Sequence, residues 1–262
     1  MKILAAFDSF KESMTAYAAG EAVQRAYNNV HICPLADGGE GTMEVMNHYL
    51  HGDIHEIEVA GPLFKTVHAK LAIMDDFAII ESAQACGLDY LTEEEKNGTE
   101  ATSYGVGEMM KYAYDHGVKR FLLTLGGSAC NDGGIGLLSG MGYGFFDQFD
   151  QRIPMNARGL ETLDHIKKTR LDLSNIEVEG ACDVTNPLCG KEGATYVFGP
   201  QKKVKDLEKT DQAMKHYAKI MSELVGKDDS CVSGAGAAGG MGYAIVTGLN
   251  GKLVTGFDAV SR

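Results

Sequence analysis

The chain has 262 residues, 44% of them hydrophobic and 23% charged, which is the balance of an ordinary globular protein with room for one large domain or two modest ones. Its 36 acidic and 24 basic residues give a net charge of −12, which repels phosphate backbones and therefore disfavours nucleic-acid binding. No run of about 18 apolar residues is present, so no membrane span is expected.

The first residues read as a strand over 2–7, a helix over 14–29 with Ser13 or Thr15 as its N-cap, and a second strand over 30–34. A further helix follows, with apolar positions at Met43, Met46 and Leu50. This alternation of strand and helix predicts a parallel sheet.

The pattern changes between residues 53 and 81, where three strand-like runs follow one another without helices between them. Successive strands of this kind favour mixed or antiparallel pairing. We therefore expect an α/β protein of two domains. The parallel sheet would belong to the first domain, and the mixed sheet to the second.

Helices and strands alternate again further along the chain. The remaining predicted elements are helices over 102–117, 204–226 and 234–248, strands over 120–125 and 178–184, and a glycine-rich turn that opens a helix over 131–142. The cysteines form no CxxC pair, and we expect free thiols in a reducing cytoplasm at Cys33, Cys86, Cys130, Cys182, Cys189 and Cys231.

Four loops follow predicted strands: residues 8–11, 36–42, 125–134 and 181–202. In open α/β sheets, ligands bind at the carboxyl ends of strands, so these loops are the candidate site. Glycine lacks a Cβ, which lets its backbone N–H approach an anion closely. The alternative is that the glycines only form tight turns. The glycines concerned are Gly38, Gly39, Gly41, Gly126, Gly127, Gly133 and Gly134.

Aspartates accompany these glycines at Asp8, Asp37, Asp132 and Asp183. A carboxylate beside a phosphate is favourable when a Mg²⁺ ion lies between them, or one aspartate could take a proton from an attacking hydroxyl. Lys11 and Lys202 would neutralise the charge of the transferred group. Turn formation or helix capping by the aspartates and a solvated surface charge at Lys11 are the alternatives.

Neither of two common nucleotide-binding motifs is present in its full form. No GxxxxGK[ST] sequence is present, so the usual P-loop signature is missing. GAGAAG at 234–239 matches GxGxxG, with Asp258 at about the expected distance, but polar residues rather than a buried strand precede it. A nicotinamide-dependent oxidoreductase is kept as a further alternative.

The chain resembles the bacterial, type I, ATP-dependent glycerate kinase family in a series of blocks that occur in family order along the whole sequence. These blocks are DSFKESMTA, PLADGGEGT, ESAQACGL, ATSYGVGE, LGGSACNDGGIGLL, ACDVTNPLCGKEGATYVFGPQK and GAGAAGGMGYA. The resemblance implies transfer of a phosphoryl group from ATP, with Mg²⁺, to a hydroxyl of D-glycerate, giving 2-phosphoglycerate or 3-phosphoglycerate.

The resemblance also implies an active site between two α/β domains. Residues 1–60 would be the N-terminal part of a Rossmann-like parallel-sheet domain whose completing C-terminal part would be absent from this sequence, and residues 61–262 a second α/β domain with a mixed sheet. The catalytic residues of the active site would be Asp8, Lys11, Asp37 and Asp183, with Asp183 or Asp37 as base or metal partner and the lysines as charge clamps. Substrate or nucleotide would contact Ser9, Gly38, Gly39, Glu40, Gly41, Ser128, Asn131, Asp132, Asn186, Gln201 and Lys202, and Asp132 and Asp183 are the metal candidates.

Family members continue with a further block after the position of Arg262. A truncated, non-catalytic remnant that binds ligand without turnover is therefore an alternative to an active kinase. We further expect a cytoplasmic protein that binds glycerate, does not bind nucleic acid or membranes, and can form a homodimer.

Overall fold

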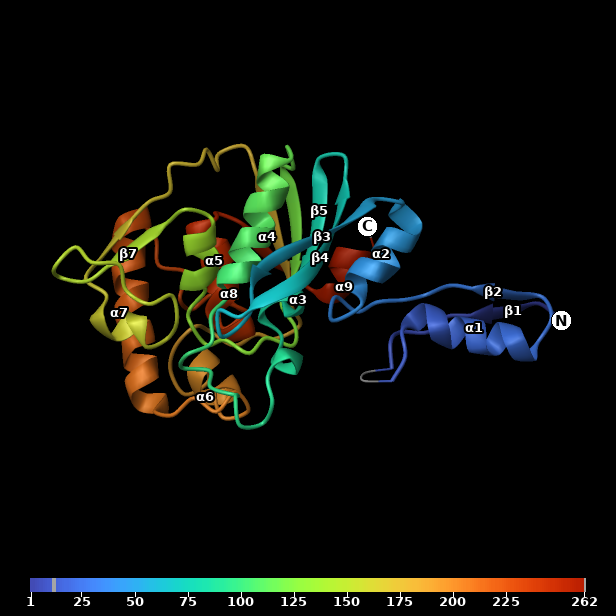
Figure 1. Cartoon of the computed structure of the whole chain (residues 1–262), viewed down its shortest axis with the longest axis horizontal. Helices are drawn as coiled ribbons and strands as arrows, with labels where there is room; N and C mark the ends of the chain where they lie inside the picture. Colours follow the sequence, from blue (N-terminus) through green and yellow to red (C-terminus); the bar gives the residue numbers. More distant parts are fainter. Residues whose placement is uncertain (11–12, 262) are drawn as a thin grey trace.

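A computed structural model describes residues 1–10 and 13–261 and shows an α/β protein (Figure 1). The expected fold class is confirmed. A mixed six-stranded sheet forms the centre, in the order β10-β9-β6-β5-β4-β3, and two smaller sheets pair β1 with β2 and β7 with β8.

The central sheet combines two kinds of strand pairing. β3 (Asp53–Ala60), β4 (Thr66–Met74) and β5 (Phe77–Glu81) pair antiparallel, as the uninterrupted strand-like runs predict. β6 (Arg120–Thr124), β9 (Glu177–Ala181) and β10 (Lys252–Val254) continue the sheet parallel to β5. The carboxyl ends of these four parallel strands therefore share one edge of the sheet.

Helices cover both faces of the central sheet, and the alternation along β5 shows why. Ala78 and Ile80 pack into the large core with α4 (Tyr104–Asp115), whereas Ile79 faces the other way. There Ile79 joins Met43 of α2 (Thr42–Leu50) and Ala259 of α9 (Gly256–Val260). The face of the large core also carries α3 (Ala83–Cys86), α5 (Ile135–Gly140), α7 (Leu207–Val225) and α8 (Ala237–Tyr243).

A small N-terminal unit extends from one side of this body (Figure 1). β1 (Ile3–Ala5) and β2 (Val30–Ile32) pair parallel, and α1 (Ala16–Ala26) connects them, with Thr15 as its N-cap. A Cβ at Gly20 would lie 2.4 Å from Cγ2 of Ile32, so glycine permits the close contact of α1 with β2. Both predicted N-terminal strands are thus confirmed, each shorter than expected.

The expected domain boundary near residue 60 falls between two paired strands of the central sheet. β3 pairs with β4 over eight residue pairs from Asp53↔Ile73 to Ala60↔Thr66, and α2 packs on the same sheet through Met43. The central sheet therefore begins before the expected boundary. The assignment of residues 1–60 and 61–262 to two domains stays a prediction.

The segment 234–248 differs from the single helix that its small residues predicted. Three consecutive residues inside α8, Ala238, Gly239 and Gly240, have positive φ angles, and a π-helical turn over Ala244–Gly248 follows. Several short elements were not predicted from the sequence: α3, β10, α9, β7 (Gly144–Phe146), β8 (His165–Lys167), α6 (Ala194–Phe198) and the 3-10 turns Leu88–Tyr90 and Gly159–Thr162. Across the described ranges, no helix is both long and apolar enough to span a membrane.

Candidate active site

The candidate loops gather at the carboxyl edge of the parallel strands. Loop 125–134 leaves β6, the segment from residue 182 leaves β9, and α9 begins two residues after β10. The loop 36–42, which precedes α2, approaches the same edge because α2 packs on the adjoining face of the sheet. This is where ligands bind in open α/β sheets.

Loop 36–42 lies directly against the start of α9. Gly38 has a φ of 91°, and a Cβ there would lie 2.2 Å from Cα of Gly256. A Cβ at Gly256 would in turn lie 1.6 Å from the carbonyl oxygen of Asp37. Neither position can therefore hold a side chain without moving the backbone. The same loop reaches loop 125–134, since a Cβ at Gly126 would be 3.8 Å from Cα of Gly39.

Asp183 is hydrogen-bonded to the same residue at the start of α9, Gly256. Its Oδ1 accepts a hydrogen bond of 2.9 Å from the backbone N–H of Gly256. The structure thus brings Asp37 and Asp183, from loops 146 residues apart in sequence, to either side of one glycine. Both side chains are exposed, so both are accessible to a ligand at this edge.

The first loop of the chain also approaches loop 36–42. Ser9 lies about 3.9 Å from where a Cβ of Gly41 would be. Asp8 accepts a hydrogen bond of 2.6 Å from the backbone N–H of Ser9, and both residues are exposed. Lys11, the predicted charge clamp of this loop, lies outside the described residues.

Glu81 is a residue of this site that the predicted set omits. It ends β5 and is buried, and its Oε1 accepts a hydrogen bond of 2.9 Å from the backbone N–H of Met43 in the first turn of α2. Burial is the main cause that raises the pKa of Glu81, while the backbone N–H groups of Met43 and Gly41 act in the opposite direction. The signal in the sequence was an acid that ends the otherwise apolar strand FAIIE.

These contacts bear on the phosphate interpretation of loop 36–42. The N–H of Met43 is bonded to Glu81, and the N–H of Gly39 donates to Oδ1 of Asp37 at 2.9 Å. Within the described chain, the N–H groups of Gly126, Gly127 and Ser128 have no hydrogen-bond acceptor, and neither do those of Gly38 and Glu40 in loop 36–42. Gly127 has a φ of 66°, and successive N–H groups in such a turn form an anion-binding concavity. Both loops therefore keep backbone donors that an anion could accept from.

Asp132 is held inside the protein. It is fully buried, and its carboxylate accepts hydrogen bonds from the N–H and Oγ of Ser103 and from the N–H groups of Gly134 and Gly136, at 2.8–3.3 Å. Burial is the main cause that raises its pKa. These contacts tie loop 125–134 to the start of α4 and argue for a structural role.

The two asparagines of the predicted set join neighbouring segments. Asn131 is buried and donates from Nδ2 to Oγ1 of Thr195 at 2.9 Å, and its Oδ1 has no partner in the described chain. Asn186 donates from Nδ2 to the carbonyl of Glu192 at 2.7 Å. The Asn131 contact holds the segment 186–195 beside loop 125–134, whereas the Asn186 contact closes a turn within that segment.

Lys202 lies deep beside the same loop. Its Nζ donates to Oγ of Ser128 at 2.9 Å and to the carbonyl of Cys130 at 2.7 Å. Lys202, Ser128 and the exposed Gln201 line a cavity of about 150 Å³ together with Gly127 and Val184. Val184 follows Asp183 directly, so this cavity adjoins the point where Asp37 and Asp183 meet Gly256.

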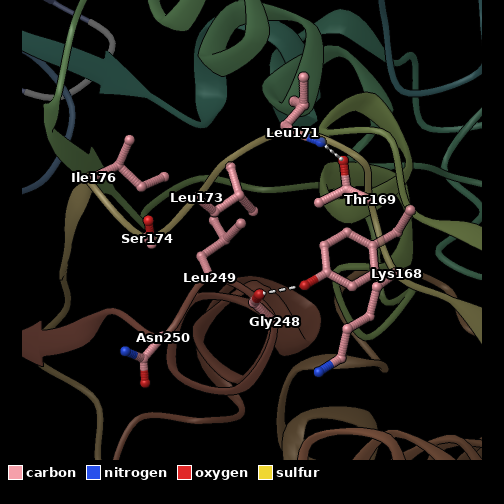
Figure 2. Close-up of a pocket in the computed structure, with 10 residues that line it drawn as sticks. Lys168, Thr169, Leu171, Leu173, Ser174, Ile176, Gly248, Leu249 and Asn250 are labelled. Carbon is pink, nitrogen blue, oxygen red and sulfur yellow. Dashed lines mark hydrogen bonds between the residues drawn. The ribbon is translucent and has the colours of Figure 1, made fainter.

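A larger cavity of about 300 Å³ lies elsewhere (Figure 2). Its walls are formed by residues 168–176, which precede β9, and by residues 248–250, which precede β10. It is therefore at the amino ends of these strands, away from the candidate site. The Tyr143 hydroxyl closes one side by donating to the carbonyl of Gly248 at 2.7 Å. None of the predicted site residues lines it.

The glycines of GAGAAG pack inside the protein. The described segment 227–236 contains no strand, so the strand–loop–helix unit of a dinucleotide site does not form there. A Cβ at Gly239 would lie 2.1 Å from the carbonyl oxygen of Cys130. Close packing of α8 against loop 125–134 explains the glycine at this position.

A mixed α/β sheet with exposed aspartates and glycine-rich loops at its carboxyl edge defines the class of α/β enzymes that bind small ligands at this edge. The glycerate kinase family model matches residues 3–262. The chain belongs to the glycerate kinase family.

Related proteins agree with this assignment. A glycerate kinase from Bacillus subtilis is 40% identical over 99% of this chain and 71% of its own length, and a glycerate 2-kinase from Escherichia coli is 37% identical over 100% of this chain and 72% of its own length. A crystal structure assigned to glycerate kinase 2 of Salmonella typhimurium LT2 superposes with a TM-score of 0.89 and 40% identity, covering 100% of this chain and 73% of that one.

Proposed function

We propose that this chain transfers the γ-phosphoryl group of ATP to a hydroxyl of D-glycerate. The main support is that Asp37 and Asp183 both contact Gly256. They lie next to the N–H groups of residues 126–128, which have no acceptor in the described chain. Exposed carboxylates and free backbone donors at one sheet edge suit a reaction that joins an anion to a hydroxyl. Family membership supports the same reaction.

Asp183 and Asp37 are the proposed proton acceptors. A general base must reach the proton of the attacking hydroxyl, directly or through one water. Oδ1 of Asp183 is fixed by Gly256, and no hydrogen bond to its Oδ2 is formed within residues 1–10 and 13–261. The side chain is therefore oriented while one oxygen stays free to accept a proton.

The residues present fit Mg²⁺ in part. Mg²⁺ is usually held by one or two carboxylates, substrate phosphates and water. When bound, it would neutralise charge on the transferred phosphoryl group. Asp183 has a free, exposed oxygen, whereas both oxygens of Asp132 are occupied by internal donors. The described residues contain no group of three or more His, Cys, Asp or Glu side chains that could hold a metal alone. We propose Asp183 as the protein's ligand, shared with ATP phosphates.

The product follows from the hydroxyl that reacts. We propose 2-phosphoglycerate, because the Escherichia coli relative is named glycerate 2-kinase, with 3-phosphoglycerate as the alternative. Incubation of the purified chain with ATP, Mg²⁺ and D-glycerate, followed by proton-coupled ³¹P NMR, separates the two. A phosphate on the CH carbon gives a doublet, and one on the CH₂ carbon a triplet.

The same assay separates a kinase from a binding protein. Turnover that requires both ATP and glycerate supports the proposal. Glycerate binding in calorimetry without any product would instead identify a non-catalytic member of the family. Cytoplasmic location and a homodimer remain predictions, and light scattering after size-exclusion chromatography measures the oligomeric state.

A further inference from the structure

Lys202 carries a buried charge for which the described chain supplies no counter-ion. The side chain lies beneath the surface, with the residue 3% exposed, and no carboxylate within residues 1–10 and 13–261 forms an ion pair with it. Its two hydrogen-bond acceptors, Oγ of Ser128 and the carbonyl of Cys130, are both neutral. An ammonium group has three donors, so one donor of Lys202 has no acceptor within the described residues, and no carboxylate contacts the charge directly.

An unmatched buried ammonium is costly, because removal from water disfavours the charged form. Burial accordingly lowers the pKa of Lys202, whereas Cys130, Cys86 and Asp132 act in the opposite direction. A neutral amine could also donate to the carbonyl of Cys130, so that hydrogen bond alone does not require a buried charge. The position is therefore suited to an anion that arrives from outside.

The adjoining cavity has room for such an anion and donors to hold it. Its walls include Lys202, Ser128 and Gly127, and the N–H groups of Gly127 and Ser128 have no acceptor in the described chain. Its volume of about 150 Å³ is below the about 300 Å³ at which pockets for drug-sized ligands begin. A small acid matches this space, and a whole nucleotide does not.

We propose that this cavity binds the carboxylate of the hydroxy-acid substrate, with Lys202 as its counter-ion. The assignment rests on the proposed function for the identity of the acid. A carboxylate carries one negative charge, which one ammonium balances, whereas a triphosphate carries several and needs more cations than this cavity offers. Val184, in the cavity wall, follows Asp183, so an acid anchored here would extend its hydroxyls towards that carboxylate.

The test compares two ligands that differ only at the anchored group. D-glycerate has a carboxylate where glycerol has a CH₂OH group. We expect calorimetry to detect D-glycerate, measured with a non-hydrolysable ATP analogue present, and to detect glycerol far more weakly. Lys202→Met should weaken D-glycerate binding by about ten- to a hundredfold, since hydrogen bonds to charged groups contribute about 1.5–3 kcal/mol. Ser128→Ala should weaken it less.

Lys205→Met is the matched control, because Lys205 is exposed and three positions along the same segment. This variant should bind D-glycerate as the wild type does. D-glycerate should also raise the melting temperature of the wild type and of Lys205→Met but not of Lys202→Met, because a ligand stabilises only the form that binds it. Ser128→Ala supplies the same comparison if Lys202→Met does not fold.

The outcomes separate the proposals. Equal weakening of D-glycerate and the ATP analogue would show that Lys202 only supports the loop, and selective loss of the analogue would place a phosphate in the cavity. Either result overturns the inference. Turnover by Lys202→Met at an unchanged glycerate KM would overturn it while the kinase function stands. Lys202-dependent binding of D-glycerate without turnover in the wild type would support the inference and reject the kinase function.

Discussion

Oε1 of Glu81, at the carboxyl end of β5, accepts a hydrogen bond of 2.9 Å from the backbone N–H of Met43 in the first turn of α2. This contact crosses from the central sheet to the helix that follows loop 36–42. Because a carboxylate near a helix N-terminus is favourable, Glu81 both orients α2 and fixes the position from which Asp37 reaches the site. It is a positioning residue for that loop.

Glu81→Ala should destabilise the protein by about 1–3 kcal/mol, since it leaves a buried N–H without its acceptor. Glu81→Gln retains an acceptor oxygen and should cost less. Urea unfolding of the two variants measures the difference. Equal losses in both would show that the negative charge, rather than the hydrogen bond, stabilises α2.

The same position predicts a pH dependence. Burial raises the pKa of Glu81 above its ordinary value of 4.5, so the folded protein keeps a proton that the unfolded chain releases. The stability contributed by Glu81 is therefore greatest below about pH 4.5 and decreases as the pH rises through the folded pKa. Glu81→Gln should gain stability relative to the wild type between about pH 4 and pH 7, as urea unfolding at both pH values would show. A constant difference would contradict this.

Gly38→Ala tests the contact between loop 36–42 and α9. A Cβ at Gly38 meets Cα of Gly256 at 2.2 Å, whereas Gly117, with a similar φ of 88°, has no atom within 4 Å of its added Cβ. Both alanines carry the cost of a left-handed conformation, about 1–2 kcal/mol. Gly38→Ala should lose clearly more stability than Gly117→Ala in urea and should also reduce kcat. Equal losses would mean that the loop moves freely.

Asp183→Asn should reduce kcat by about 10²–10⁴ if Asp183 accepts the proton. Asparagine keeps an oxygen for the N–H of Gly256, so the melting temperature should change little. Asp75→Asn is the control, because Asp75 is exposed in the turn before β5, at the opposite edge of the sheet. A kcat near that of the wild type in Asp183→Asn would move the base role to Asp37.

The part of the fold that the sequence predicted well depends on local patterns. The antiparallel run 53–81 was visible as strand-like segments without helices, and α7 shows the expected amphipathic pattern, with Met214, Tyr217 and Met221 buried. The prediction of a single helix over residues 234–248 was wrong, because the small residues of this segment are compatible with a helix in the sequence alone. The close approach of Gly239 to Cys130, which interrupts that helix, depends on tertiary contacts.

In the candidate site, too, features set by local sequence were predicted and features set by tertiary contacts were not. Strand order predicted that the loops lie near one edge, and in the structure residues 36–42, 125–134 and 183 lie close together there. Burial could not be read from the sequence. Asp132 and Asp183 look alike beside glycine- or asparagine-rich loops, yet one is sealed inside the protein and the other is exposed.

Asp132→Asn tests whether the buried carboxylate is structural. Asparagine offers one acceptor oxygen, and its NH₂ group would face a backbone N–H, because both oxygens of Asp132 accept from internal donors. We expect a loss of about 1–3 kcal/mol or more in urea unfolding, with the Mg²⁺ concentration for half-maximal activity unchanged in the folded enzyme. A metal ligand would behave differently. If Asp132 were a metal ligand, Asp132→Asn would raise the Mg²⁺ concentration for half-maximal activity at little cost in stability. That result would support Asp132 as a metal ligand.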